Sequence, residues 1–239
     1  MIPYVVINGI SSKMVNGLLV QSLPPISKPK IRTEIEEVDG RDGDIVTTLG
    51  YSAYDKEFTI GLYGDYNVDD VIEFFNTSGT VVFSNEPDKY YKFAIYEQID
   101  FEKLIRFKTA TVSMHVQPFK YSEDETTITN TYSDVTSATI SVRNSGNVYA
   151  RPTLTITGKG DVDVYINNTQ ILSLALDTGD FETIIINGAE MNAYNSDGAY
   201  LNRQVTGDYD DLIFRAGVNT LTLEGNITSV LIDNYSRWI

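Results

Sequence analysis

Few side chains in this sequence have a type and spacing that could do chemistry. His115 is the only histidine among the 239 residues, and it lies in a strand-like alternation with Val112, Met114 and Val116. A general base needs a nucleophile and an orienting partner, and no Gly-x-Ser-x-Gly elbow accompanies this histidine. A single histidine also cannot build a histidine-rich metal centre. We therefore expect His115 to be a structural or surface residue.

Carboxylates are the next candidates for chemistry. The loops 39–44 and 208–211 each carry three aspartates, and calcium takes such oxygen ligands. Neither loop fits the EF-hand pattern, and Arg41 interrupts the first. Asp161 and Asp163 share one strand face, as the acids of a glycoside hydrolase could, but no second feature marks them. Solvated turns are the favoured interpretation, so we expect no catalytic residue, no cofactor and no metal.

Aromatic side chains leave one binding function open. The chain has 16 tyrosines and one tryptophan. Exposed rings can stack on sugar faces, whereas core and interface positions are the more common use of aromatic residues. The candidates for saccharide contact in the second half are Tyr194, Tyr200, Tyr209 and Trp238.

The charge balance limits the partners. The formal net charge is −15, with 12 basic and 20 acidic residues up to Thr127 and 6 and 13 beyond it, which gives −8 and −7. No basic tract could follow a phosphate backbone, so specific nucleic-acid binding is not expected. The absence of cysteine excludes disulfides. The sequence has no signal peptide and no run of 18 apolar residues. We therefore expect that the chain does not insert into a membrane and that it is assembled in the cytoplasm.

The elements of the first half are mostly strands. Asn8-Gly9 predicts a tight hairpin, and a loop with two glycines spans Asp39–Asp44. One helix is expected at about residues 68–78, capped by Asn67 or Asp69 and ended by Gly79. The segment Phe83–Ile95 reads as strand, turn at Glu86-Pro-Asp88, and strand, and its aromatic residues are expected to pack in the core or at a subunit contact.

The second half has a different character. After the acidic run 122–127 the chain is rich in Thr, Ile, Val and Asn, with turn residues at short intervals. This pattern predicts an antiparallel sandwich without a helix of two turns or more. The predicted domains are residues 1–127 and 128–239. The expected strands are Ala138–Arg143, Thr153–Gly158, Asp163–Ile166, Gln170–Ala175, Glu182–Ile186, Leu212–Phe214, Thr220–Glu224 and Ser229–Tyr235.

An ordered set of segments resembles the distal tail (Dit) proteins of long-tailed bacteriophages. The resemblance extends over both halves and agrees with the lack of catalytic motifs. The segments, in order, are Asn8-Gly9, Gly40-Arg-Asp-Gly43, the helix Asp69–Thr77, Ser84–Tyr91, Gln117-Pro-Phe119, Asn144–Asn147, Arg151-Pro152, Gly217-Val-Asn219, Gly225 and Arg237-Trp238.

The resemblance implies a structural, non-enzymatic part of a virion tail. It implies a mainly β fold, with a β-sandwich-like first domain that holds the one helix and a second domain like a galectin or carbohydrate-module jelly roll. Six copies would form a hub ring that joins the tail tube protein to a tail-associated lysin or fibre protein. The second domain would meet receptor-binding proteins or cell-wall saccharide, although the chain lacks the long inserted arm with which some members hold receptor-binding proteins.

A ring of identical subunits needs two different contact surfaces on each subunit. Hairpins and Gly-rich loops can reach a neighbour, so the predicted interface residues are Asn8, Gly9, Gly40, Arg41, Asp42 and Gly43. An acidic lumen would repel DNA phosphate. The alternative is a carbohydrate-binding module without catalysis, and a cell-wall hydrolase is the weaker third hypothesis.

Overall fold

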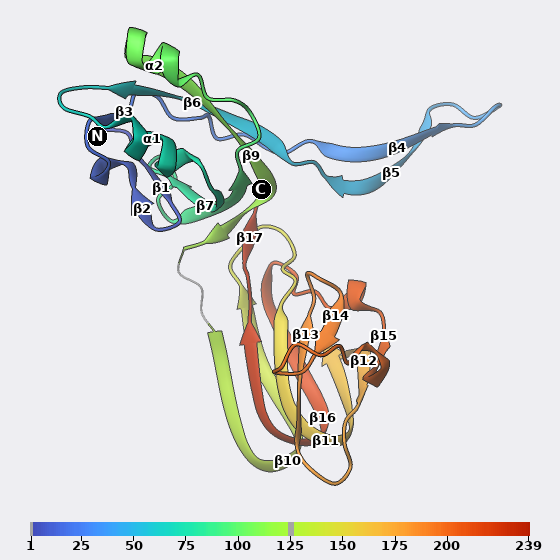
Figure 1. Ribbon diagram of the computed structural model, residues 1–239. Helices are drawn as coiled ribbons and strands as arrows, with labels where there is room; N and C mark the ends of the chain where they lie inside the picture. Colours follow the sequence, from blue (N-terminus) through green and yellow to red (C-terminus); the bar gives the residue numbers. More distant parts are fainter. Residues whose placement is uncertain (1, 124–126) are drawn as a thin grey trace. The chain divides into compact units, whose positions relative to one another are not determined.

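The computed structural model describes residues 2–123 and 127–239. The chain forms two compact units, Met1–Glu123 together with Ile239, and Asp124–Trp238 (Figure 1). Part of the acidic run that predicted the domain boundary, residues 124–126, lies outside the described residues. Strands dominate both units, so the mainly β prediction is confirmed.

The first unit is built on one curled antiparallel sheet. Apolar side chains alternate along its central strands and point to one buried face, as Phe58, Ile60 and Val112 do. Buried residues of α1 complete this core. The strand order is β2 (Ile10–Ser11), β1 (Val5–Ile7), β7 (Ser78–Phe83), β8 (Lys89–Ala94), β9 (Thr109–Ser122), β6 (Tyr54–Leu62) and β3 (Leu18–Val20).

The predicted helix is α1 (Val68–Phe75). The Asn67 side chain accepts a hydrogen bond from the backbone N–H of Asp69 at 3.1 Å, which caps the first turn. Val71, Phe74 and Phe75 are buried against the sheet. The helix is shorter than the predicted 68–78 because Ser78 already starts β7. Gly79 therefore does not end the helix but lies within that strand.

The prediction of a single helix is wrong, because α2 (Phe101–Phe107) follows β8. The Asp100 carboxylate accepts a hydrogen bond from the Lys103 backbone N–H at 2.7 Å, and Lys108 ends the helix in a left-handed conformation. Only Leu104 of this helix is buried. Phe101, Leu104 and Ile105 have the helical i, i+3, i+4 spacing, but seven residues are too short for this pattern to distinguish a helix from a strand. A 3-10 turn, η1 (Ser12–Met14), follows β2.

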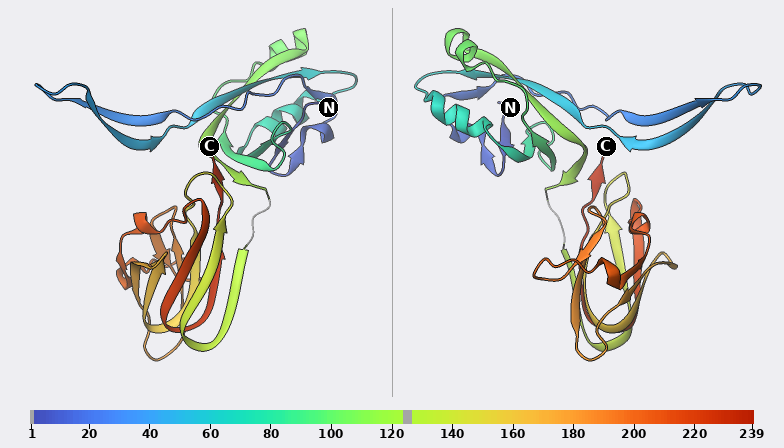
Figure 2. Two further views of the ribbon diagram at one scale, coloured as in Figure 1. Left: turned by 180° about the vertical axis from the view of Figure 1, so that it is seen from behind. Right: turned by 45° about the vertical axis from the view of Figure 1, so that its right-hand side comes forward.

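A long hairpin is the remaining part of the first unit. Strands β4 (Ile31–Glu37) and β5 (Asp44–Tyr51) pair only with each other in the described part of the chain. In both views of Figure 2 this blue ribbon extends away from the sheet of its unit. We call residues 31–51 the arm.

The second unit is a two-layer antiparallel structure made by bent strands. The three longest strands of this unit, β10, β11 and β16, each curve near the middle, where their pairing registers shift, and so run through both layers (Figure 1). The first half of β11 pairs with β13, whereas its second half pairs with β12. The strands of its seven-stranded sheet are β10 (Thr127–Asn144), β11 (Thr153–Ile166), β12 (Thr169–Ala175), β13 (Glu182–Asn187), β14 (Asn192–Tyr194), β15 (Val205–Gly207) and β16 (Gly217–Asp233), and β17 (Arg237–Trp238) lies outside this sheet.

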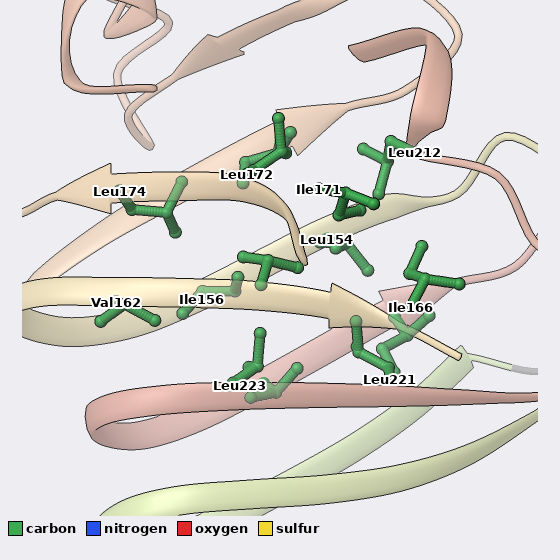
Figure 3. Close-up of a cluster of buried hydrophobic side chains, with 14 of the residues drawn as sticks. Leu154, Ile156, Val162, Ile166, Ile171, Leu172, Leu174, Leu212, Leu221 and Leu223 are labelled. Carbon is green, nitrogen blue, oxygen red and sulfur yellow. The ribbon is translucent and has the colours of Figure 1, made fainter. Parts of the chain in front are cut away.

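Glycine makes the bend of β16 possible. Gly225 has a φ of +140°, and a Cβ there would lie 2.4 Å from the carbonyl oxygen of Asp161. No other residue could occupy this position without moving the β11 backbone. The bend brings the two layers over one apolar core (Figure 3), where Leu154 and Ile156 from one layer meet Leu172 and Leu223 from the other.

Regular helix is scarce in the second unit. Its described residues hold only two 3-10 turns, η2 (Asn202–Gln204) and η3 (Tyr209–Asp211). Over the whole described chain, neither α-helix has the length and hydropathy that a membrane crossing requires.

Candidate assembly surfaces

The Asn8-Gly9 turn is fixed within its own unit. Asn8 has a φ of +48° and Gly9 of +82°, which is the geometry of the expected tight hairpin. The Asn8 side chain accepts a hydrogen bond from the Thr80 N–H at 2.9 Å and donates to the Thr77 hydroxyl at 3.1 Å. Gly79 leaves room for this contact, since a Cβ there would lie 2.2 Å from Asn8 Oδ1. The turn therefore links the end of β1 to the start of β7, and these hydrogen bonds hold it in a fixed conformation.

The other predicted interface residues form the tip of the arm. Gly40 and Gly43 have φ values of +82° and +77°, and the Arg41 N–H donates to the Val38 carbonyl at 3.1 Å. The side chains of Arg41 and Asp42 are exposed. The described residues contain no group of three or more metal-ligating side chains, so the aspartates of this tip do not converge.

The body of the arm exposes apolar side chains to solvent. Ile35 and Val46 face each other across the two strands, and each is 58% exposed. Leu49 is 53% exposed. A two-stranded ribbon is marginal in water by itself, and exposed apolar residues on it mark an interaction surface. The sequence-based prediction placed interface residues at the tip of the arm and did not include the exposed apolar side chains of its strands.

A groove lies on the same unit, between the first hairpin and α1. It has a volume of about 310 Å³. Ile10 is 53% exposed there, and Met14 of the adjacent η1 is 78% exposed. The rim is acidic, with Asp70 and Glu73 of α1. The apolar wall is formed by Ile7, Ile10, Val15 and Phe74. We call this the α1 groove.

A buried polar cluster stabilises the segment Phe83–Ile95. The Glu86 carboxylate accepts hydrogen bonds from the Lys120 ammonium and from the Tyr91 hydroxyl, both at 2.7 Å. The Lys56 ammonium donates to the Pro25 carbonyl at 2.9 Å and lies 4.8 Å from the centre of the Tyr91 ring. Glu86 therefore begins a turn, as predicted. Its carboxylate also neutralises the charge of the buried Lys120 ammonium.

Burial governs the titration of this cluster. Burial raises the pKa of the Tyr91 hydroxyl above its ordinary value, and its hydrogen bond to the Glu86 carboxylate raises it further. Burial lowers the pKa of the Lys56 ammonium, which the Glu86 carboxylate partly opposes. Both shifts have burial as their main cause, so the cluster is a desolvated structural element of the first unit.

The histidine and the carboxylates take structural positions. His115 Nδ1 lies 2.7 Å from Asp55 Oδ1 across the β6–β9 pair. Asp163 accepts hydrogen bonds from the side chains of Gln170 and Ser173. In the loop 208–211, the Asp208 carboxylate caps η3 and Asp210 forms an ion pair with Arg151 at 2.7 Å. These contacts engage Asp163, Asp208 and Asp210, which are three of the aspartates that the sequence offered for catalysis or calcium binding.

The predicted saccharide contacts lie on separate elements. Tyr194 on β14 and Tyr200 form a backbone bridge, and Tyr200 is 73% exposed. Tyr209 is partly buried against the core, and its hydroxyl donates to Asn202 at 3.3 Å. Trp238 lies on β17. In the described part of the chain, none of the three tyrosines stacks on another ring, so they form no aromatic platform.

Comparison with known proteins shows a likeness of fold to phage tail structures. No protein-family model matches the sequence. No curated protein matches it either. The crystal structure of the SPP1 Dit (gp 19.1) protein, described as a paradigm of the hub adsorption apparatus in Gram-positive infecting phages, matches with a TM-score of 0.66 and 17% identity over 100% of both chains. A chain of the phage P2 baseplate in its activated conformation with Ca matches with a TM-score of 0.50 and 10% identity over 98% of both chains. The chain therefore has the fold of these proteins over its full length, as the sequence resemblance predicted.

Proposed function

We propose that this chain, which has the fold of the phage hub protein Dit, is a structural subunit of a phage tail tip. Copies of it would form a ring that joins the tail tube to the host-adsorption apparatus. The full-length match to SPP1 Dit carries this proposal, because it includes both units and not one common β-domain. The fold shared with a baseplate chain of phage P2 supports the same role.

The ring is proposed as a homohexamer with head-to-tail contacts. Such contacts need two different surfaces on each subunit, and the first unit offers two. The arm presents Ile35, Val46 and Leu49 to solvent, and the α1 groove presents Ile10. We assign these surfaces to opposite sides of the subunit contact, with the tip residues Gly40–Gly43 at the end of the reaching element.

The partners follow from this place in the virion. One ring face would meet the tail tube protein, and the other would meet the tail-associated lysin or fibre protein. The second unit would meet receptor-binding proteins or the cell wall. The formal charge of −15 supports a role beside DNA in transit, because acidic walls repel phosphate. No step of this function requires catalysis by the chain.

Imaging of the purified chain tests the proposal. Mass photometry and negative-stain microscopy should show a population with six times the chain mass of 26.7 kDa and rings with a central hole. A strict monomer at high concentration, together with tight binding to cell-wall glycan, would overturn the hub in favour of a carbohydrate-binding module.

A further inference from the structure

The arm is joined to its unit by two short passages of chain. One is the segment of residues 21–30, which follows β3 and contains no helix or strand. The other is residues 52–53, between β5 and β6. We call residues 21–30 the strap, and the two passages together the root of the arm. The arm cannot rotate as a body without bending both passages, so the contacts of the root decide which way it points.

Proline prevents the strap from joining the sheet as a strand. Pro24, Pro25 and Pro29 have no backbone N–H and cannot donate to a neighbouring strand. Pro24 and Pro29 are nevertheless buried. At the start of the strap, the Gln21 N–H donates to the Thr59 carbonyl of β6 at 2.8 Å. The strap carbonyls beyond that point need donors other than a sheet ladder.

Two side chains from the sheet supply such donors. The Lys56 ammonium, on β6, donates to the Pro25 carbonyl at 2.9 Å. The Asn85 amide, in the turn between β7 and β8, donates to the Pro24 carbonyl at 3.1 Å. Consecutive carbonyls of the strap are therefore held from two different parts of the sheet.

The two passages of the root are also bonded to each other. The hydroxyl of Tyr54, the first residue of β6, donates to the Ser27 carbonyl of the strap at 3.4 Å. The Ser52 N–H donates to the Lys30 carbonyl at 2.8 Å. A swing of the arm would have to break these cross-links.

Lys56 makes the strongest of these contacts. Its side chain lies in the core, since the residue is only 3% exposed. Within the described chain the Pro25 carbonyl is its one hydrogen-bond acceptor, and the ammonium otherwise faces the rings of Tyr91 and Phe83 at 4.8 and 5.7 Å. Hydrogen bonds from a charged donor are about twice as strong as neutral ones, so this contact is the main hold on the strap.

The buried polar cluster keeps the donors in place. Glu86 follows Asn85 in the same turn, and its carboxylate binds Lys120 of β9 and the Tyr91 hydroxyl of β8. The turn that carries Asn85 is thus fixed to two strands. The cluster therefore also supports the contacts that hold the strap.

We propose that Lys56, Tyr54 and Asn85 form a lock that sets the direction of the arm. While the lock is closed, the arm leaves the sheet in one direction. When it opens, the arm swings about its root. An arm that is already oriented loses less conformational entropy when it binds a partner. The lock is a property of the single chain, so it goes beyond the proposed ring and does not depend on ring formation.

The distance between two spin labels tests the lock. The chain contains no cysteine, so Asp42→Cys at the tip of the arm and Thr111→Cys at an exposed position of β9 give two unique labelling sites. Double electron–electron resonance on the full-length labelled chain, diluted with unlabelled chain, reports the tip-to-sheet distance within one copy. The parent should give a single narrow distance distribution.

Two lock variants should broaden this distribution about two-fold or more, because lost hydrogen bonds favour local opening. Lys56→Met keeps a long apolar stem but removes the charged donor. Tyr54→Phe combined with Asn85→Ala removes two neutral donors and no charge, so it tests the lock even where Lys56→Met fails to fold.

Matched variants give the control. Lys103→Met, and Tyr63→Phe combined with Asn76→Ala, remove the same groups from exposed positions of the first unit outside the root, and should leave the distribution narrow. The proposal is overturned if neither lock variant broadens the distribution, if the controls broaden it equally, or if the parent distribution is already broad.

Ring formation by the same variants is a separate measurement. Mass photometry that finds intact rings of a lock variant with a broad distance distribution would still support the lock. That result would count against the arm as the subunit contact, so the two proposals can fail independently.

Discussion

At the residue scale, the contact between the first hairpin and β7 depends on the absence of a side chain at Gly79. Its lack of a Cβ lets the Asn8 side chain reach Thr80 and tie the first hairpin to β7. The sequence pattern predicted the Asn8-Gly9 turn but assigned Gly79 to the end of the helix. The pairing of a turn with a strand some seventy residues away depends on sheet order, which local patterns do not contain.

Replacing Gly79 by alanine should destabilise the first unit. The substitution combines a positive φ of 139° with a clash at 2.2 Å from Asn8 Oδ1, so we expect a loss of about 2–4 kcal/mol in the free energy of unfolding. Gly64→Ala is the control, since Gly64 has a φ of +56° but no atom within 4 Å of a Cβ. Urea denaturation compares the two. Equal losses of unfolding free energy in the two variants would show that the Asn8 hydrogen bonds do not contribute to stability.

Tyr91 should make the protein sensitive to alkaline pH. Because its pKa is raised in the folded state, both states keep the proton below pH 10, the ordinary tyrosine value. Above pH 10 only the unfolded state releases it. Stability therefore falls with rising pH, by up to about 1.4 kcal/mol per pH unit for this group. Burial also raises the pKa of Tyr54, which adds to the loss of stability at alkaline pH. Lys56 has the opposite effect below its ordinary pKa, because burial lowers its pKa in the folded state.

Tyr91→Phe isolates this contribution. The variant should lose about 1 kcal/mol at neutral pH, since Glu86 loses one hydrogen bond, but its stability should fall less steeply between pH 10 and 11. Urea midpoints over that range measure the difference, and Tyr200→Phe at an exposed ring is the control. A slope that Tyr91→Phe leaves unchanged would contradict the assignment.

At the element scale, the arm has the fewest stabilising contacts within its own unit to explain its structure. Its strands expose Ile35 and Val46 on one face, and the unit supplies no partner strand for either edge of the arm within the described residues. A stable arm therefore points to burial in an assembly, which agrees with the proposed ring contact.

Replacing Ile35 and Val46 by threonine should weaken the ring. Threonine keeps the β-branched shape that suits a strand, so the arm should still form while its apolar contact is lost. Each buried side chain of this kind contributes about 1.5–3 kcal/mol, and the ring should dissociate at protein concentrations at least ten-fold higher than for the parent chain. Mass photometry over a dilution series measures this.

Val218→Thr is the matched control for the arm variant, because Val218 is an exposed strand residue of the second unit. It should leave the ring intact. If the arm variant and the control dissociate at the same concentration, the arm is not at the subunit contact.

The elements themselves were only partly predictable. The helix α1 was evident from its cap and its apolar face, whereas α2 buries only Leu104 and is too short for its apolar spacing to be distinctive. In the second half, Thr153–Gly158 and Asp163–Ile166 were expected as two strands but are the two halves of β11. The polar bend at residues 158–161 breaks the alternation, and only the pairing with β16 shows that the strand continues.

At the scale of the whole molecule, charge opposes assembly. Each chain carries a formal charge of −15, so six copies repel one another unless salt screens them. Apolar contacts at the arm would have to overcome this repulsion.

The proposed ring should therefore be stabilised by salt. Between about 25 and 300 mM NaCl the Debye length falls from roughly 20 to 6 Å, and the apparent dissociation constant of the ring should fall several-fold. Sedimentation velocity at fixed protein concentration measures the shift, with KCl as a check that the effect is ionic strength. Dissociation on adding salt would instead indicate a contact dominated by ion pairs, such as one made by Arg41.

The candidate sites were the least predictable part of the molecule. Glu86 and Lys120 are 34 residues apart, and Lys56 and Pro25 are 31 residues apart, so only the fold brings each pair together. Charged residues of this kind are common in the sequence, and nothing in their spacing distinguishes a paired acid from an unpaired one. Their roles follow from the fold and not from the motif.

The continuous strands β10, β11 and β16 have a mechanical consequence. Two layers that share only side-chain contacts can slide over each other, but here the covalent backbone of three strands passes from one layer to the other. A pulling force on one layer is carried into the second by peptide bonds. The second unit should thus yield to load in one abrupt rupture instead of shearing apart layer by layer.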